Sequence, residues 1–153
     1  ELRMAYRMFD VTTIFPEYGG DRMEKPFIAK HRGFVNLTMS NRKKWQWNIT
    51  GQLYGRQRIP GYTTGINPET VLMNFSNVFP LVSTQLSKRM VNKPFEWYVG
   101  LENVLNYRQQ NPILNADNPI GPGFDAAMVW GPVFGRMAYA GFRYRLKITE
   151  DEE

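Results

Sequence analysis

Cysteine is absent from the 153-residue sequence, and histidine occurs once, at His31. The absence of cysteine excludes disulfide bonds, thiolate zinc sites and cysteine nucleophiles. His31 lies between Lys30 and Arg32, and no G-x-S-x-G motif accompanies it, so a serine–histidine–acid triad is not expected. We therefore predict that the chain is not an enzyme, and we predict no catalytic residue, metal site or cofactor.

Carboxylates at the spacing needed for glycoside hydrolysis are also lacking. Glu96 and Glu102 fall on the same face of one expected strand, but strand geometry places them about 20 Å apart. The carboxylate pairs that cleave glycosidic bonds lie much closer together. We interpret both residues as charges on a wet strand face.

A run of about 18 apolar residues, which a membrane-spanning helix requires, is missing as well. The mean hydropathy is −0.45, which resembles that of a water-soluble protein. A transmembrane β-strand needs only about 9–11 residues with one apolar face, so these observations exclude a helical span and leave a barrel possible. Aromatic residues make up 14% of the chain, which argues against disorder because rings provide surface to bury.

The net charge of +5 raises the question of nucleic-acid binding. However, the basic residues are spread along the chain and mostly occupy the polar positions of alternating segments, as on a solvated strand face. We therefore expect no nucleic-acid partner.

Alternation of apolar and polar residues with a period of two is the main local signal. It is clearest where Trp45, Trp47, Ile49 and Leu53 share one face of a segment. We predict six antiparallel strands, near residues 2–14, 29–41, 45–59, 80–90, 95–106 and 136–148. The residues expected to face lipid are Trp45, Trp47, Ile49, Leu53, Trp97, Val99, Leu101, Phe142, Tyr144 and Leu146.

The connections between these strands alternate in length. Short turns are expected at 41–44 and 91–94, whereas long loops are expected near 15–28, 60–79 and 107–135. Short periplasmic turns and long outer loops are typical of an up-and-down outer-membrane β-barrel. Loops of this length count against a compact soluble domain, so a soluble ligand-binding barrel is the least favoured alternative. The fold prediction is an all-β, antiparallel, up-and-down transmembrane barrel in the bacterial outer membrane.

Several linked segments carry a family resemblance. The strongest is G-x-E-N-x-x-N-Y at residues 100–107, followed by Asn111-Pro112-Ile113, a segment at 124–136 and a terminal aromatic strand at 139–146. Upstream, residues 5–11, 30–33 and 55–60 extend the pattern. The chain resembles the C-terminal barrel of TonB-dependent outer-membrane receptors, especially the SusC-like group.

This resemblance implies a 22-stranded barrel with a separate N-terminal plug, through which the TonB system admits a bulky nutrient such as an iron chelate, a cofactor, an oligosaccharide or a peptide. The chain would supply about the last six strands, too few to close a barrel, so we expect a fragment or a chain completed by other polypeptide. Expected partners are the rest of the barrel and plug, lipid and lipopolysaccharide, and a surface lipoprotein or envelope complex. The alternative is a structural barrel component that does not transport.

Ligand contacts are predicted at the outer rim. The loop at 107–135 is the best candidate, although it could instead fold over its own barrel edge. Two arginines at the outer end of the third strand could attract an anionic ligand, or could pair with lipopolysaccharide or with neighbouring carboxylates. The predicted contact residues are Arg56, Arg58, Arg108, Gln110, Asp125 and Trp130.

Overall fold

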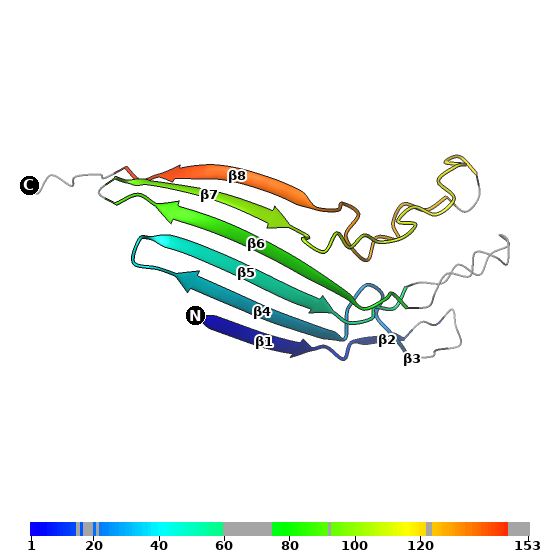
Figure 1. Ribbon diagram of the computed structural model, residues 1–153. Coiled ribbons are helices and arrows are strands. Elements are labelled where there is room, and N and C mark those ends of the chain that lie inside the picture. Colours follow the sequence, from blue (N-terminus) through cyan, green and yellow to red (C-terminus); the bar gives the residue numbers. More distant parts are fainter. Residues whose placement is uncertain are drawn as a thin grey trace, which may run out of the picture.

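A computed structural model of the chain describes residues 1–14, 16, 20, 22–59, 75–91, 93–121 and 124–146. Within these ranges the protein forms eight β-strands and no α-helix, and Figure 1 shows the long strands lying side by side in one twisted layer. The prediction of an all-β antiparallel fold is confirmed. None of the described residues belongs to a helix long and apolar enough to span a membrane.

The main sheet contains six strands in the order β1-β4-β5-β6-β7-β8, and every neighbouring pair is antiparallel. A second sheet contains only β2 and β3. The strands are β1 (Leu2–Met8), β2 (Thr12–Ile14), β3 (Arg22–Glu24), β4 (His31–Ser40), β5 (Trp45–Tyr54), β6 (Phe79–Arg89), β7 (Phe95–Glu102) and β8 (Met137–Tyr144).

Short and long connections lie at opposite ends of the sheet. The connections at 41–44 and 90–94 are at the left end in Figure 1, which we call the turn end. The connections that follow β1, β5 and β7 are at the right end, which we call the loop end. At the first short turn Lys44 adopts a left-handed conformation, and the Asn41 side chain accepts a hydrogen bond from the Trp45 amide at 3.2 Å.

The structure does not form the single strand predicted at 2–14, because β1 ends at Met8. Its partner β4 begins at His31, so the backbone beyond Met8 soon runs out of a neighbour and pairs locally instead. Thr12–Ile14 pairs with Arg22–Glu24, inside the segment expected to be a loop at 15–28. This small β2–β3 hairpin stands at the loop end of the sheet (Figure 1).

Three other strands are shorter than expected. β5 ends at Tyr54, after which the Gly55 amide donates to the His31 carbonyl at 2.8 Å and the chain leaves the sheet. β7 ends at Glu102 because Asn103 takes up a left-handed conformation. β8 ends at Tyr144. The loop expected at 60–79 lies mostly outside the described residues.

Two tyrosines lock the last strand pair together. Tyr98 lies opposite Gly141, and Tyr139 lies opposite Gly100. A Cβ atom on either glycine would overlap the outer end of the facing tyrosine side chain, so a larger residue there would require that tyrosine to move. The two rings lie 6.2 Å apart, and the Tyr139 hydroxyl donates to Gln85 at 3.0 Å.

Buried hydrophobic side chains gather at the loop end and not beneath the middle of the sheet. The hydrophobic residues buried in the described part are Ala29, Ile59, Phe79 and Met128. Only Phe79 belongs to a main strand, at the first position of β6. The middle of the six-stranded sheet therefore has no core of its own on either face.

Candidate functional site

One face of the main sheet is apolar and exposed. Directly opposed residues of an antiparallel pair project to the same side, so the register assigns each side chain to a face. The residues expected to face lipid all share this side along β5, β7 and β8, and Leu146, just beyond β8, is 80% exposed. The apolar face also includes Met4, Val35, Leu37, Met39, Val82, Leu86 and Ala140.

Aromatic side chains concentrate on the apolar face near the turn end. Trp45 and Trp97 meet edge to face with ring centroids 5.4 Å apart, and Phe95 stacks on Phe142 at 5.7 Å. Lys88 lies over the Trp45 ring at 4.9 Å and donates to the Lys43 carbonyl. The turn-end aromatic cluster consists of Trp45, Trp47, Phe95, Trp97, Phe142 and Tyr144.

Several polar side chains of the apolar face pair within the sheet. The Trp47 indole donates to the Thr84 hydroxyl at 2.7 Å, and that hydroxyl donates to the Asn48 carbonyl at 3.2 Å. Near the loop end the Tyr6 hydroxyl is 2.6 Å from Nδ1 of His31. Such internal pairing is what an environment without water demands of exposed polar groups.

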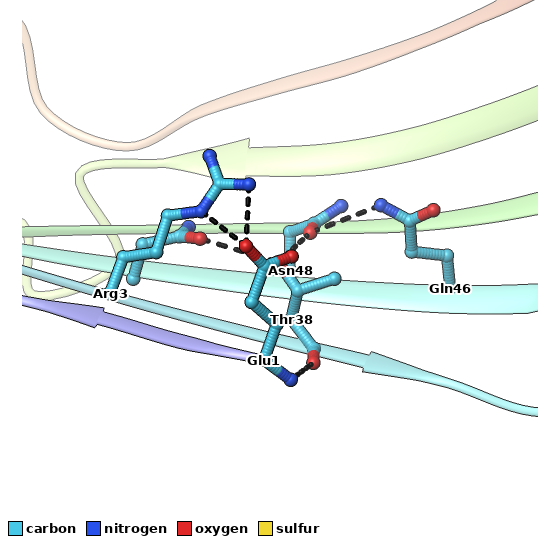
Figure 2. Close-up of polar contacts among 6 residues, drawn as sticks. Glu1, Arg3, Thr38, Gln46 and Asn48 are labelled. Carbon is cyan, nitrogen blue, oxygen red and sulfur yellow. Dashed lines mark hydrogen bonds and ion pairs between the residues drawn. The ribbon is translucent and has the colours of Figure 1, made fainter.

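The opposite face is polar and carries a hydrogen-bonded ladder. Thr38 donates to the Asn48 side chain at 2.8 Å, and Gln46 donates to the same amide oxygen at 3.3 Å (Figure 2). Asn36 donates to the Thr50 hydroxyl at 2.8 Å. This ladder fixes the side chains of the polar face without excluding water from them.

Ion pairs add to the polar face at both outer strands. Arg3 contacts Glu1 at 2.5 Å, and this hydrogen bond and charge lower the pKa of the Glu1 carboxyl (Figure 2). Near the opposite edge of the sheet, on the same polar face, Glu96 lies 3.4 Å from Arg143 and 3.7 Å from Arg89. Arg89 and Arg143 are therefore both paired with a carboxylate.

At the loop end of the polar face, aromatic rings form a stack. Phe79 is 2% exposed and lies between Tyr54 at 4.8 Å and Tyr107 at 5.0 Å, nearly parallel to both. Trp130 contacts the same ring at 5.7 Å. Burial in this stack raises the pKa of the Tyr107 hydroxyl. The stack is contributed by β5, β6 and the connection after β7, so it joins segments distant in the chain.

Gln109 holds the returning part of that connection in place. Its side-chain oxygen accepts from the Trp130 and Gly131 amides at 2.8 and 2.9 Å, and its amide donates to the Met128 carbonyl at 2.6 Å. Gln57 donates to the Trp130 carbonyl at 3.1 Å. Residues 128–131 are thereby fixed over the loop end of the polar face.

A cleft of about 400 Å³ opens beside this fixed segment. Arg7, Arg32 and Tyr54 line it from β1, β4 and β5. Phe9 and Phe27, from the connection between β1 and β4, line it together with Trp130. Its volume is within the range of small-molecule sites, and its lining combines cations with apolar rings.

Two arginines of this cleft occupy opposed positions on adjacent strands. Arg7 of β1 lies directly opposite Arg32 of β4. Each guanidinium lies 4.1 Å from a ring centroid, Arg7 over Phe9 and Arg32 over Tyr54. The ion pairs of the described residues include neither arginine. The cleft is therefore electropositive.

The structure places the predicted contact residues apart. Trp130 alone of the six lines the cleft. Arg56 lies over the Phe75 ring at 4.6 Å, and Arg58 donates to the Glu24 carbonyl at 3.3 Å. Asp125 accepts from the Ala127 amide at 2.6 Å, while Arg108 and Gln110 are exposed. Their roles in ligand binding stay predictions.

Sequence reasoning missed Arg7 and Arg32 as candidates. Both stand at polar positions of predicted strands, so the sequence indicated their face but gave no sign of their pairing. The register between β1 and β4 depends on a connection that contains its own hairpin. Basic residues at matching register positions of adjacent predicted strands are the signal that would have identified them.

Within the described ranges, no group of three or more His, Asp or Glu side chains is placed to hold a metal ion. No protein-family model matches the chain, and no curated protein or solved structure is significantly similar to it. Function is therefore inferred from the geometry of the two faces and the cleft.

Proposed function

We propose that this chain forms part of the wall of a bacterial outer-membrane β-barrel, a TonB-dependent receptor of the SusC-like type that imports a bulky nutrient. The observation that carries the proposal is the apolar face, which continues across all six main strands. Exposed fractions on it include 72% at Met4 and 71% at Phe142. Apolar surface on this scale requires a non-aqueous neighbour.

Four further observations support lipid as that neighbour. The turn-end aromatic cluster is positioned as a membrane-interface girdle would be, with Lys88 reaching from it toward the turn. The Trp47 indole, which stands on the apolar face, finds its partner inside the sheet. The polar face is hydrogen-bonded as a wet lumen would require, and the connections are short at one end and long at the other.

The barrel would be completed by additional strands. β1 and β8 each have one neighbour in the described sheet, so each presents a free backbone edge. Such edges are normally paired or covered, and membrane barrels abolish them by closure. In the proposed receptor the remaining wall strands and the plug would occupy these edges and the lumen.

Tryptophan fluorescence in vesicles containing brominated lipid tests the proposal. Trp45, Trp47 and Trp97 lie on the apolar face, whereas Trp130 lies in the cleft at the loop end. We expect bromine near the bilayer centre or interface to quench the first three and to spare Trp130. Single-tryptophan variants, with phenylalanine at the other positions, assign each signal. Equal quenching at all four positions, or full recovery of the native protein in buffer without detergent, would contradict the membrane assignment.

A further inference from the structure

We propose that the cleft beside Trp130 binds a small organic anion, with a phosphate or carboxylate head held between Arg7 and Arg32 and a ring-sized apolar body held by the aromatic lining. The proposal names the ligand chemistry of the polar face, and it rests on the proposed function because only a lumen places this cleft on the path of a ligand. Of the residues that it uses, only Trp130 was predicted from the sequence as a contact residue.

The arginine pair places two like charges at opposed positions of adjacent strands. Like charges directly opposite each other in an antiparallel sheet are destabilising, because their Cβ atoms are only about 5 Å apart. Arg7 and Arg32 occupy such a position. An anion between the two guanidiniums turns this repulsion into two charge-assisted attractions.

The orientation of the two guanidiniums is set by aromatic rings. Each is 4.1 Å from a ring centroid, with Phe9 beneath Arg7 and Tyr54 beneath Arg32. Stacking occupies the flat face of a guanidinium and leaves its N–H groups at the edge. Those edges are the part that binds phosphate and carboxylate oxygens in a forked geometry. The rings thus hold the donors ready without neutralising their charge.

The aromatic walls set the body of the ligand. Phe27 and Trp130 line the cleft from two different connections. Trp130 is held from behind, because its amide donates to Gln109 and its carbonyl accepts from Gln57. A wall fixed in this way favours a rigid, flat group over a flexible chain, since little ordering is needed on binding. The volume of about 400 Å³ suits one ring and its head group.

Calorimetric titration of the purified full chain in detergent with phenyl phosphate, benzoate, inorganic phosphate and phenol tests this site. We expect phenyl phosphate or benzoate to bind, inorganic phosphate to bind more weakly, and neutral phenol not to bind. Comparison of the first two probes decides between a phosphate and a carboxylate head. Arg7→Gln and Arg32→Gln should each weaken binding about tenfold or more, because each removes charge-assisted hydrogen bonds. Arg42→Gln, at the turn end, is the matched control and should bind as the native chain does.

The stability of each unliganded variant, compared with that of the native chain in the same detergent, checks that the variants fold. Removing one of two opposed like charges should leave the unliganded protein as stable as the native chain or more stable. Absence of binding by every anion, or equal binding by the arginine variants, would overturn the proposal. If brominated lipid quenches the apolar-face tryptophans when the same proteins are placed in vesicles, a failure to bind anions contradicts the cleft proposal alone. Loss of quenching in the native chain contradicts the membrane role instead.

Discussion

The apolar and the polar face belong to the same six strands, yet their side chains are satisfied in different ways. On the polar face, threonines, asparagines and glutamines bond to one another across strands, as Thr38 and Asn48 do. On the apolar face, residues such as Met4 remain largely exposed and find no covering element in the described sheet. The hydrogen-bonded polar side chains are thus compatible with water on their side of the sheet. The exposed apolar side chains depend instead on the medium that surrounds the protein.

The largest effect is expected when the same charge is placed on each face of one strand. Val35 and Phe34 are neighbours in β4, are 45% and 37% exposed, and point to the apolar and polar face respectively. In lipid vesicles, Val35→Arg should lower the free energy of unfolding by about 2–4 kcal/mol, because arginine is costly near the middle of a bilayer. Phe34→Arg is the control and should cost far less. Equal losses in urea titrations would mean that the two faces meet the same solvent.

A smaller effect is expected where the polar face acquires its cover. Gln109→Leu leaves the Trp130 and Gly131 amides and the Met128 carbonyl without their side-chain partner, at a cost of about 1–3 kcal/mol. We expect faster hydrogen exchange at residues 128–131, with the strands unaffected. The exposed neighbour offers a control in Gln110→Leu, which should change nothing. Unaltered exchange in the Gln109 variant would show that the Gln57 hydrogen bond and the aromatic stack hold the segment without Gln109.

The smallest effect concerns the pH at which this cover loosens. Burial raises the pKa of Tyr107 above its usual value of about 10, so the folded protein favours the protonated phenol. The resulting stability is fully present below pH 10 and is lost as the pH rises through the folded pKa. Absorbance titration of tyrosinate should show one late-titrating group that disappears in Tyr107→Phe. A late group that persists in that variant would assign the raised pKa to another tyrosine.

The strands were predictable because their signal is local. Alternation in Trp45–Tyr54 identifies both a strand and the side to which each residue points, without knowledge of any neighbour. The turn between β4 and β5 was equally accessible from its four polar residues. The alternation could not predict where a strand stops, since β1 ends opposite His31, the first residue of β4, and not where its own pattern fades.

The cleft was not predictable for a related reason. Its floor unites residues from β1, β4 and β5, and Trp130 from the last long connection completes it. Each of these residues has an ordinary local explanation, as a polar strand position or an aromatic in a loop. Only the register between strands and the three hydrogen bonds of the Gln109 side chain bring them together.

The tyrosine and glycine pairs of β7 and β8 have a consequence for how such a sheet is assembled. A shift of one residue between these strands would press Tyr98 against a side chain and leave both glycines facing the wrong partners. A register error between these strands therefore carries a steric cost at the two tyrosines as well as the exchange of the two faces. The tyrosine and glycine pairs thus favour one alignment of β7 and β8, beside the edge of β8 that has no neighbour in the described sheet.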